Sequence, residues 1–231
     1  MTLTTSFARL RRLRRDTTAL AMLEFALSLP AVLMVGLYGV ESANLALTNL
    51  RVSQMALNLA DNASRVGVAS TLSVQQLREV DINDALQAVR LQGGNIGLLK
   101  NGRVTLSSLE ESGGQQRIHW QRCLGLKKGA GYDSSYGTTP ITAGVDATPA
   151  NAGTVVDGMG ETGSKVTAPP SSGVMFVEIN YDYQPLVSGW LLKTGRLHYT
   201  ASFVVRDRRD FAQIYNPSPT ATRSTCNLYS S

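Results

Sequence analysis

ALAMLEFALSLPAVLMVGLYGV, residues 19–40, is the stretch that decides the fold of this chain. Its single charged residue is Glu24. As a helix, a stretch of this length rises about 33 Å, which is enough to cross the hydrocarbon core of a bilayer. We therefore expect residues 19–40 to span a membrane. A carboxylate inside such a span is costly, so Glu24 is the first candidate for a functional residue.

A basic leader precedes this stretch and predicts its orientation. The leader, residues 1–16, carries five arginines between Arg9 and Arg15, followed by Asp16. Basic flanks stay on the cytoplasmic side of a membrane helix, so the rest of the chain is expected outside the cytoplasm. The leader also holds +4 of the net charge of +5, which leaves no basic face for a phosphate backbone. The expected partners therefore include the lipid bilayer and no nucleic acid.

The helix is expected to continue well beyond the membrane span. Residues 41–65 contain no glycine or proline, and apolar side chains recur there at helical spacing. These apolar positions are Val52, Met55, Ala56, Leu59, Ala60, Ala63 and Val66. We expect one helix over residues 17–66, with its second half packed on a soluble domain. Pro30 lies in the membrane half, where proline is tolerated and usually kinks the helix.

Residues 67–231 are expected to form an extracytoplasmic α+β domain. Ser73-Val-Gln-Gln76 resembles a capping box and predicts the start of a second helix. Gly93-Gly94 would end that helix, and Asp81-Ile-Asn-Asp84 would interrupt it. Helices followed by a run of strands favour an antiparallel sheet, one face of which the amphipathic half of the long helix can cover.

Four segments have the period of two that is typical of strands: residues 103–109, 116–123, 174–183 and 196–206. Gly113-Gly114 lies between the first two and suits a hairpin turn. Residues 127–172 are rich in Gly, Ser, Thr, Ala and Pro, and we expect a long loop with little core of its own.

The chain has two cysteines, Cys123 and Cys226. If the domain is exported, an even count predicts a disulfide, which would draw the C-terminal tail back to the strand that ends near Cys123. Two unrelated buried thiols are the alternative.

A search for catalytic chemistry finds little, so we expect no enzyme, no cofactor and no metal site. His119 and His198 lie in strand patterns without metal-ligand spacing, which favours packing or surface roles. Glu178 and Asp182 share one strand face but lie about 13 Å apart, too far for a paired acid and base, and we expect both to be solvated. The run from Asp207 to Asp210 is interpreted as a solvated strand end, with an interface patch as the alternative.

The N-terminal residues carry a more specific pattern. A basic leader, then Ala19-Leu-Ala-Met-Leu-Glu-Phe25, resembles the processing region of type IV pilins, and more closely the TadE-like family of tight-adherence (Flp, type IVb) pilus assembly. In the soluble part Trp120-Gln-Arg-Cys123, the segment Ala201–Arg206 and the lone cysteine pair are weaker points of likeness. The resemblance is specific over residues 9–48 alone.

This resemblance implies a function and its residues. A prepilin peptidase would cut between Ala19 and Leu20, and Glu24 and Phe25 would become mature positions five and six and serve assembly. The chain would be a minor pseudopilin of the bacterial inner membrane with a pilin-like fold. Its partners would be other pilins or pseudopilins and the pilus assembly platform.

One departure from the family pattern keeps other interpretations open. Ala19 stands where the family usually has glycine, and a Cβ at the scissile position can slow or prevent cleavage. An uncleaved single-span anchor for a binding or adhesion module outside a pilus system is therefore the alternative function. In that case Glu24 is a tolerated charge that reaches the cytoplasmic interface.

Overall fold

The computed structural model describes residues 17–69, 74–187, 189 and 195–230. The chain divides into two compact units, each treated by itself below. The first unit comprises Met1–Ala46 and Pro185–Lys193, and the second comprises Leu47–Gln184 and Thr194–Ser231. The basic leader, residues 1–16, lies outside the described residues.

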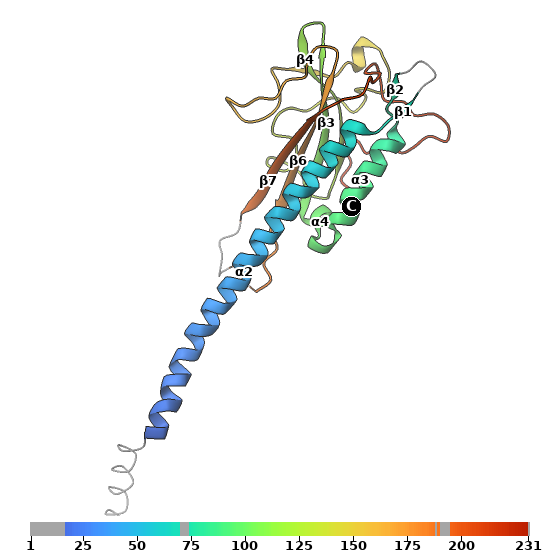
Figure 1. The fold of residues 1–231 in the computed structure, drawn as a ribbon. Coiled ribbons are helices and arrows are strands. Elements are labelled where there is room, and N and C mark those ends of the chain that lie inside the picture. The colour runs from blue at the N-terminus through green and yellow to red at the C-terminus, as the bar shows by residue number, and fades with distance from the viewer. Residues whose placement is uncertain (1–16, 70–73, 188, 190–194, 231) are drawn as a thin grey trace, which may run out of the picture. The chain divides into compact units, whose positions relative to one another are not determined.

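Helix α2 (Thr17–Arg65) is one continuous α-helix of 49 residues, drawn from blue to teal in Figure 1. The expected long helix is thus confirmed, and it ends one residue earlier than predicted. It continues through Pro30, whose missing N–H leaves the carbonyl of Ala26 without its usual helical donor. Residues up to Ala46 belong to the first unit and residues from Leu47 belong to the second.

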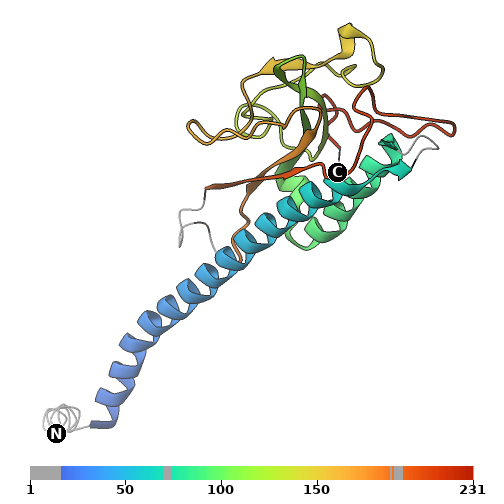
Figure 2. The same cartoon turned by 45° about the horizontal axis from the view of Figure 1, so that its top comes forward.

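Residues 47–65 of α2 carry the apolar stripe into the core of the second unit. Six of its seven predicted members are at most 3% exposed: Val52, Met55, Ala56, Leu59, Ala60 and Ala63. Val66 is half-buried. Figures 1 and 2 both place the second helix, α3 (Glu79–Gly93), alongside this part of α2. The helical period in the sequence therefore identified a real buried face.

The start of the second helix differs from the prediction. Gln75–Gln76 form a short strand, β2, which pairs with β1 (Val68–Ala69), and Ser73 lies outside the described residues. Helix α3 begins at Glu79 instead, because the Asp81 carboxylate accepts a 3.0 Å hydrogen bond from the Arg78 backbone N–H and caps the first turn. Asp81 thus starts the helix where an interruption was expected.

The second helix ends at Gly93, as predicted, and two short helical turns lead into the sheet. These are the 3₁₀ turn η1 (Gly94–Ile96) and α4 (Leu98–Asn101). A Cβ at Gly93 would lie 2.7 Å from the side chain of Leu98, so glycine lets the chain turn back closely here.

The sheet has five antiparallel strands in the order β5-β4-β3-β6-β7. The strands are β3 (Gly102–Ser112), β4 (Gln115–Leu124), β5 (Thr154–Val156), β6 (Gly173–Asp182) and β7 (Arg196–Val204). The predicted hairpin turn has φ of +63° at Gly113 and +78° at Gly114, the positive values that a type I′ two-residue hairpin loop requires at both positions. The fold class is therefore α+β with an antiparallel sheet.

Residues 127–172 hold more core than their composition predicted. They supply the edge strand β5, the 3₁₀ turn η2 (Pro149–Asn151) and a cover for part of the sheet. Met159 and Ala168 from this segment are buried against β-strand residues such as Phe176. The expectation of little core was wrong. A few apolar side chains among many small residues are enough to form a core when they pack on an apolar sheet face.

Candidate functional site

The first half of α2 holds the residues that the sequence singled out. Ala19 and Leu20 lie in its opening turns, and the Leu20 side chain is 55% exposed. Glu24 follows Leu20 by four residues, so both side chains lie on one face, about 6 Å apart along the axis. Phe25 is 62% exposed beside them. The helix thus brings the candidate cleavage position and the candidate assembly carboxylate within one turn of each other.

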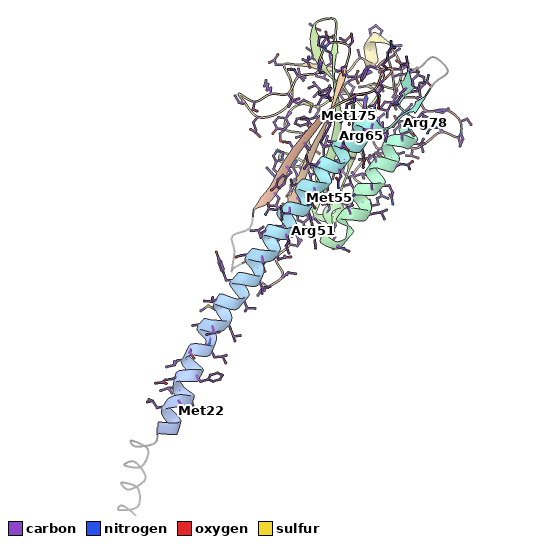
Figure 3. The ribbon with its side chains drawn as sticks, in the orientation of Figure 1. Met22, Arg51, Met55, Arg65, Arg78 and Met175 are labelled. Carbon is purple, nitrogen blue, oxygen red and sulfur yellow. A yellow bond between two sulfur atoms is a disulfide. The ribbon has the colours of Figure 1, made fainter. Side chains whose placement is uncertain are left out.

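The surface around these residues is predominantly apolar. Every described side chain of residues 20–40 is exposed, and Figure 3 shows them projecting outward around Met22. The large exposed members are Leu20, Met22, Leu23, Phe25, Leu27, Leu29, Val32, Leu33, Met34, Val35, Leu37, Tyr38 and Val40. Water would make such a surface costly, at about 25 cal/mol per Å² of apolar area. This helix is long and apolar enough to cross a membrane.

Polar and small groups interrupt this surface at few places. Ser28 Oγ donates a 3.1 Å hydrogen bond to the Phe25 carbonyl, so its hydroxyl is satisfied within the helix. A Cβ at Gly36 or Gly39 would meet nothing within 4 Å, which leaves room for another helix to approach the backbone. Glu24 is the one ionisable side chain of residues 20–37.

Glu41 is a residue that sequence reasoning missed. Its side chain is fully buried, although it follows the apolar stretch directly. The carboxylate accepts hydrogen bonds from the backbone N–H groups of Leu186, at 3.1 Å, and Val187, at 2.9 Å. The signal available in the sequence was a lone acidic residue at the end of a membrane span.

The predicted disulfide is present between Cys123 and Cys226, with 4.8 Å between the Cα atoms. It holds the C-terminal tail against β4, where the Cys123 N–H also donates to the Ser224 carbonyl at 2.7 Å. Buried Arg103 also holds the tail in place: its guanidinium donates hydrogen bonds to the carbonyls of Cys226 and Leu228. The sequence did not reveal this contact. The tail is therefore an integral part of the second unit.

A buried ion pair joins α3 to β4. Glu79 is fully buried and accepts two hydrogen bonds from the guanidinium of Arg122, which is 1% exposed. Arg223 from the tail approaches the same carboxylate at 3.3 Å. Glu79 lies at the first residue of α3, where the helix dipole also favours a negative charge. These groups bind three distant segments of the chain together.

Glu178 was expected to be solvated, and the structure corrects this. It is 1% exposed on β6, and its carboxylate accepts hydrogen bonds from the Ser134 hydroxyl and, at 2.9 Å, the Ser135 N–H. Burial raises the pKa of Glu178 above the usual carboxyl range, and these two bonds oppose the rise. The long loop, residues 127–172, covers Glu178 on this face of the sheet. The alternation of residues along the strand therefore predicted solvent where the loop lies.

Asp182 was also expected to be solvated, and the structure has it half-buried. Burial opposes its ionisation, but hydrogen bonds from Tyr132 and Lys127 outweigh that effect and hold the pKa of Asp182 below its usual value.

The run from Asp207 to Asp210 is solvated only in part. Arg209 is buried and donates to the carbonyls of Ala63 and Val66, which lie at the C-terminal end of α2.

His119 lies beside an open recess in the second unit, of about 500 Å³. Its Nδ1 is 2.8 Å from a carboxylate oxygen of Glu110, and the other oxygen accepts a 2.6 Å bond from Ser108 Oγ. The hydroxyl and the imidazole both bond to the carboxylate, whereas a nucleophile triad needs the imidazole between the other two. This order of bonds satisfies buried polar groups, as expected of a packing histidine. His198 is exposed on β7, with Nδ1 at 2.7 Å from Asn180 Oδ1.

Within the described ranges, no group of three or more His, Cys, Asp or Glu side chains is arranged to hold a metal ion. The comparisons with known proteins add no relative: no protein-family model matches the chain, and neither does a curated protein or a solved structure.

Proposed function

We propose that this chain is a minor pseudopilin, anchored in the bacterial inner membrane, that acts in the assembly of a tight-adherence pilus. The observation that carries the proposal is the single carboxylate on the apolar half of α2, four residues after Leu20. The α+β architecture, in which a long N-terminal helix accompanies an antiparallel sheet, supports this proposal. The proposed role is structural, without catalysis or a cofactor.

In this proposal a prepilin peptidase cuts between Ala19 and Leu20. Cleavage removes the arginines of the leader and creates an α-ammonium group on Leu20 in a poorly solvated place. A positive charge there also opposes the helix dipole, whose N-terminal end is itself positive. The Glu24 carboxylate, on the same helix or on a neighbouring subunit, offsets both effects. Pairing compensates part of the desolvation cost of the two charges.

The apolar surface around Glu24 supplies the rest of the assembly contact. In the membrane, lipid covers Phe25 and its exposed neighbours. In a complex, the helices of other pilins or pseudopilins replace that lipid, and the charge pair sets how far one helix shifts along the next. An unpaired charge in the wrong register is costly, so the pair favours one register over others.

The test is association of Glu24 variants with partner subunits in intact membranes. Glu24→Gln is nearly isosteric and removes only the charge, so it should leave cleavage largely intact and reduce cross-linked partner by about tenfold, equivalent to about 1.4 kcal/mol. Glu24→Asp should keep part of the association. Ser28→Ala is the matched control, because the Ser28 hydroxyl bonds only within its own helix turn, and it should behave as wild type.

A second candidate function is a membrane-tethered binding module outside any pilus system. The recess beside His119 and Glu110, which Arg117 and Phe211 also line, is the feature that favours it. The two accounts differ in what they require of Glu24. Wild-type association by Glu24→Gln, at equal amounts of processed protein, would contradict the pseudopilin proposal and favour the tethered module.

A further inference from the structure

Glu41 uses its carboxylate to hold the connector between β6 and β7. Oxygen Oε2 accepts the backbone N–H groups of two consecutive residues, Leu186 at 3.1 Å and Val187 at 2.9 Å. Hydrogen bonds to an ionised acceptor are about twice as strong as neutral ones, which explains how a charged group tolerates full burial here. The contact lies within the first unit.

The position of this contact along α2 is informative. Val40 ends the uninterrupted apolar stretch, and Glu41 is followed by a mixed sequence in which polar residues such as Ser42 and Asn44 alternate with apolar ones such as Leu47. Tyr38 is 51% exposed one turn before Glu41, and tyrosine is typical of the level where a membrane helix meets the lipid headgroups. With α2 spanning the bilayer as proposed, Glu41 would lie at the boundary between the hydrocarbon core and the aqueous side.

The connector turns two large apolar side chains outward at that boundary. Leu186 is 65% exposed and Val187 is 40% exposed, although their backbone is fixed on Glu41. Because Glu41 bonds to their backbone N–H groups, the side chains of Leu186 and Val187 take no part in this contact.

We infer that residues 185–187, at the start of the β6–β7 connector, form a second membrane contact, in which Leu186 and Val187 enter the lipid interface and Glu41 positions them. The occupant is lipid because Leu186 and Val187 are exposed apolar side chains whose backbone is bonded to Glu41, the residue that directly follows the uninterrupted exposed stretch of residues 20–40. The inference rests on the proposal that α2 spans the bilayer. Its consequence is a two-point attachment, which restricts how α2 tilts and rotates in the membrane more than a single helix would.

The test measures depth in the bilayer with nitroxide spin labels on the full-length chain in phospholipid vesicles. Labels are attached to Leu186→Cys, to Val32→Cys in the span and to Val155→Cys on β5. Val32 is 65% exposed and Val155 is 50% exposed, so all three positions accept a label. The native cysteines are joined as a disulfide and do not react. Collision rates with oxygen, which concentrates in lipid, and with a water-soluble nickel chelate report depth.

The expected result is an oxygen-to-nickel collision ratio at Leu186 several times that at Val155, and below that at Val32. Glu41→Ala should lower the ratio at Leu186, and Glu41→Gln, which keeps one acceptor oxygen, should lower it less. A water-like ratio at Leu186 with a lipid-like ratio at Val32 would overturn the inference and leave the anchor intact. Low collision rates with both reagents at Leu186 would mean that protein covers it, which also overturns the inference. A water-like ratio at Val32 would refute the membrane span itself.

Discussion

The Glu79 carboxylate and the Arg122 guanidinium form a buried, two-point ion pair that joins the first turn of α3 to β4. The two residues are separated by 43 positions in the sequence. Helix α3 packs beside the buried half of α2, so this pair fixes the helical layer on the sheet (Figure 1). Removal of one partner would leave the other charge buried without compensation.

Arg122→Met should therefore lower the free energy of unfolding by about 3–5 kcal/mol. Thermal unfolding of the full-length chain in detergent, followed by circular dichroism, measures the effect, expected as a fall in Tm of roughly 10 °C. Arg65→Met is the matched control, since its ion pair with Asp61 is exposed and worth about 0–1 kcal/mol. The double variant Glu79→Gln with Arg122→Met should lose less than the two single losses added together. Equal Tm values for Arg122→Met and Arg65→Met would refute the role given to the pair.

The disulfide should stabilise the second unit by closing a loop of 103 residues between Cys123 and Cys226. Chain entropy alone gives about 4–5 kcal/mol for a loop of this size. The Cys123→Ser, Cys226→Ser double variant should unfold at lower temperature, and reductant should lower the Tm of wild type but not of the variant. Mass spectrometry without reduction should recover the joined peptides from protein made in an oxidising compartment. Two free thiols there would contradict the bridge.

Glu178 should make the free energy of unfolding decrease as the pH rises above the ordinary carboxyl pKa. Its pKa is raised in the folded protein, so between the ordinary carboxyl pKa and that raised value the folded state binds more protons than the unfolded state. Glu178→Gln keeps an oxygen for the Ser135 N–H and has no charge to desolvate. At about pH 4 the Tm of the variant should equal that of wild type. At about pH 8 the Tm of the variant should be the higher of the two.

Asp157→Asn is the control for this measurement, since the Asp157 side chain is 95% exposed and its replacement should leave the pH profile of wild type in place. A Glu178→Gln profile parallel to that of wild type would show that Glu178 has the same pKa in both states, against the account.

The sequence located the elements whose signals are local. The apolar stripe of α2 repeats every three to four residues, and the β3–β4 hairpin has Gly113-Gly114 at its turn, so both were predictable from short windows. Glu24 and Leu20 are related by helical spacing alone, so the candidate site also followed from the sequence. The disulfide was predictable because the chain offers a single pairing.

The errors concern residues whose partners are distant in sequence. Glu178 bonds to Ser134 and Ser135, 43 to 44 positions away, and no local pattern reveals that a loop covers its strand. Buried Arg209 bonds to carbonyls at the end of α2, and Glu41 bonds to a connector 145 positions later. In each case the partner of the charged residue is a backbone or hydroxyl group that carries no sequence signal, so the burial of Glu178 and Arg209 was not foreseen and Glu41 was missed.

The orientation of the chain is predicted by the arginines between Arg9 and Arg15. Basic residues next to a membrane helix stay in the cytoplasm, so the second unit should lie on the opposite side. Alkaline phosphatase fused after Ser231 should be active, since it folds only outside the cytoplasm. An inactive fusion, together with an active cytoplasmic reporter at the same position, would reverse the topology.

Ala19→Gly should be processed at least as well as wild type, because it removes the Cβ at the scissile position. The rate of conversion from precursor to mature chain, followed in membranes that contain the peptidase, measures this. Ala19→Leu, which adds bulk at the same position, should slow conversion. Equal rates for all three chains would show that the side chain at residue 19 does not control cleavage.

The central claim is that the chain matures by a cut between Ala19 and Leu20, which gives Glu24 a new α-amine to neutralise. The most direct measurement is N-terminal sequencing of the protein recovered from membranes, with and without an active prepilin peptidase. The account predicts a terminus at Leu20 when the peptidase is present and the intact leader when it is absent. An intact leader in every molecule under both conditions would contradict it.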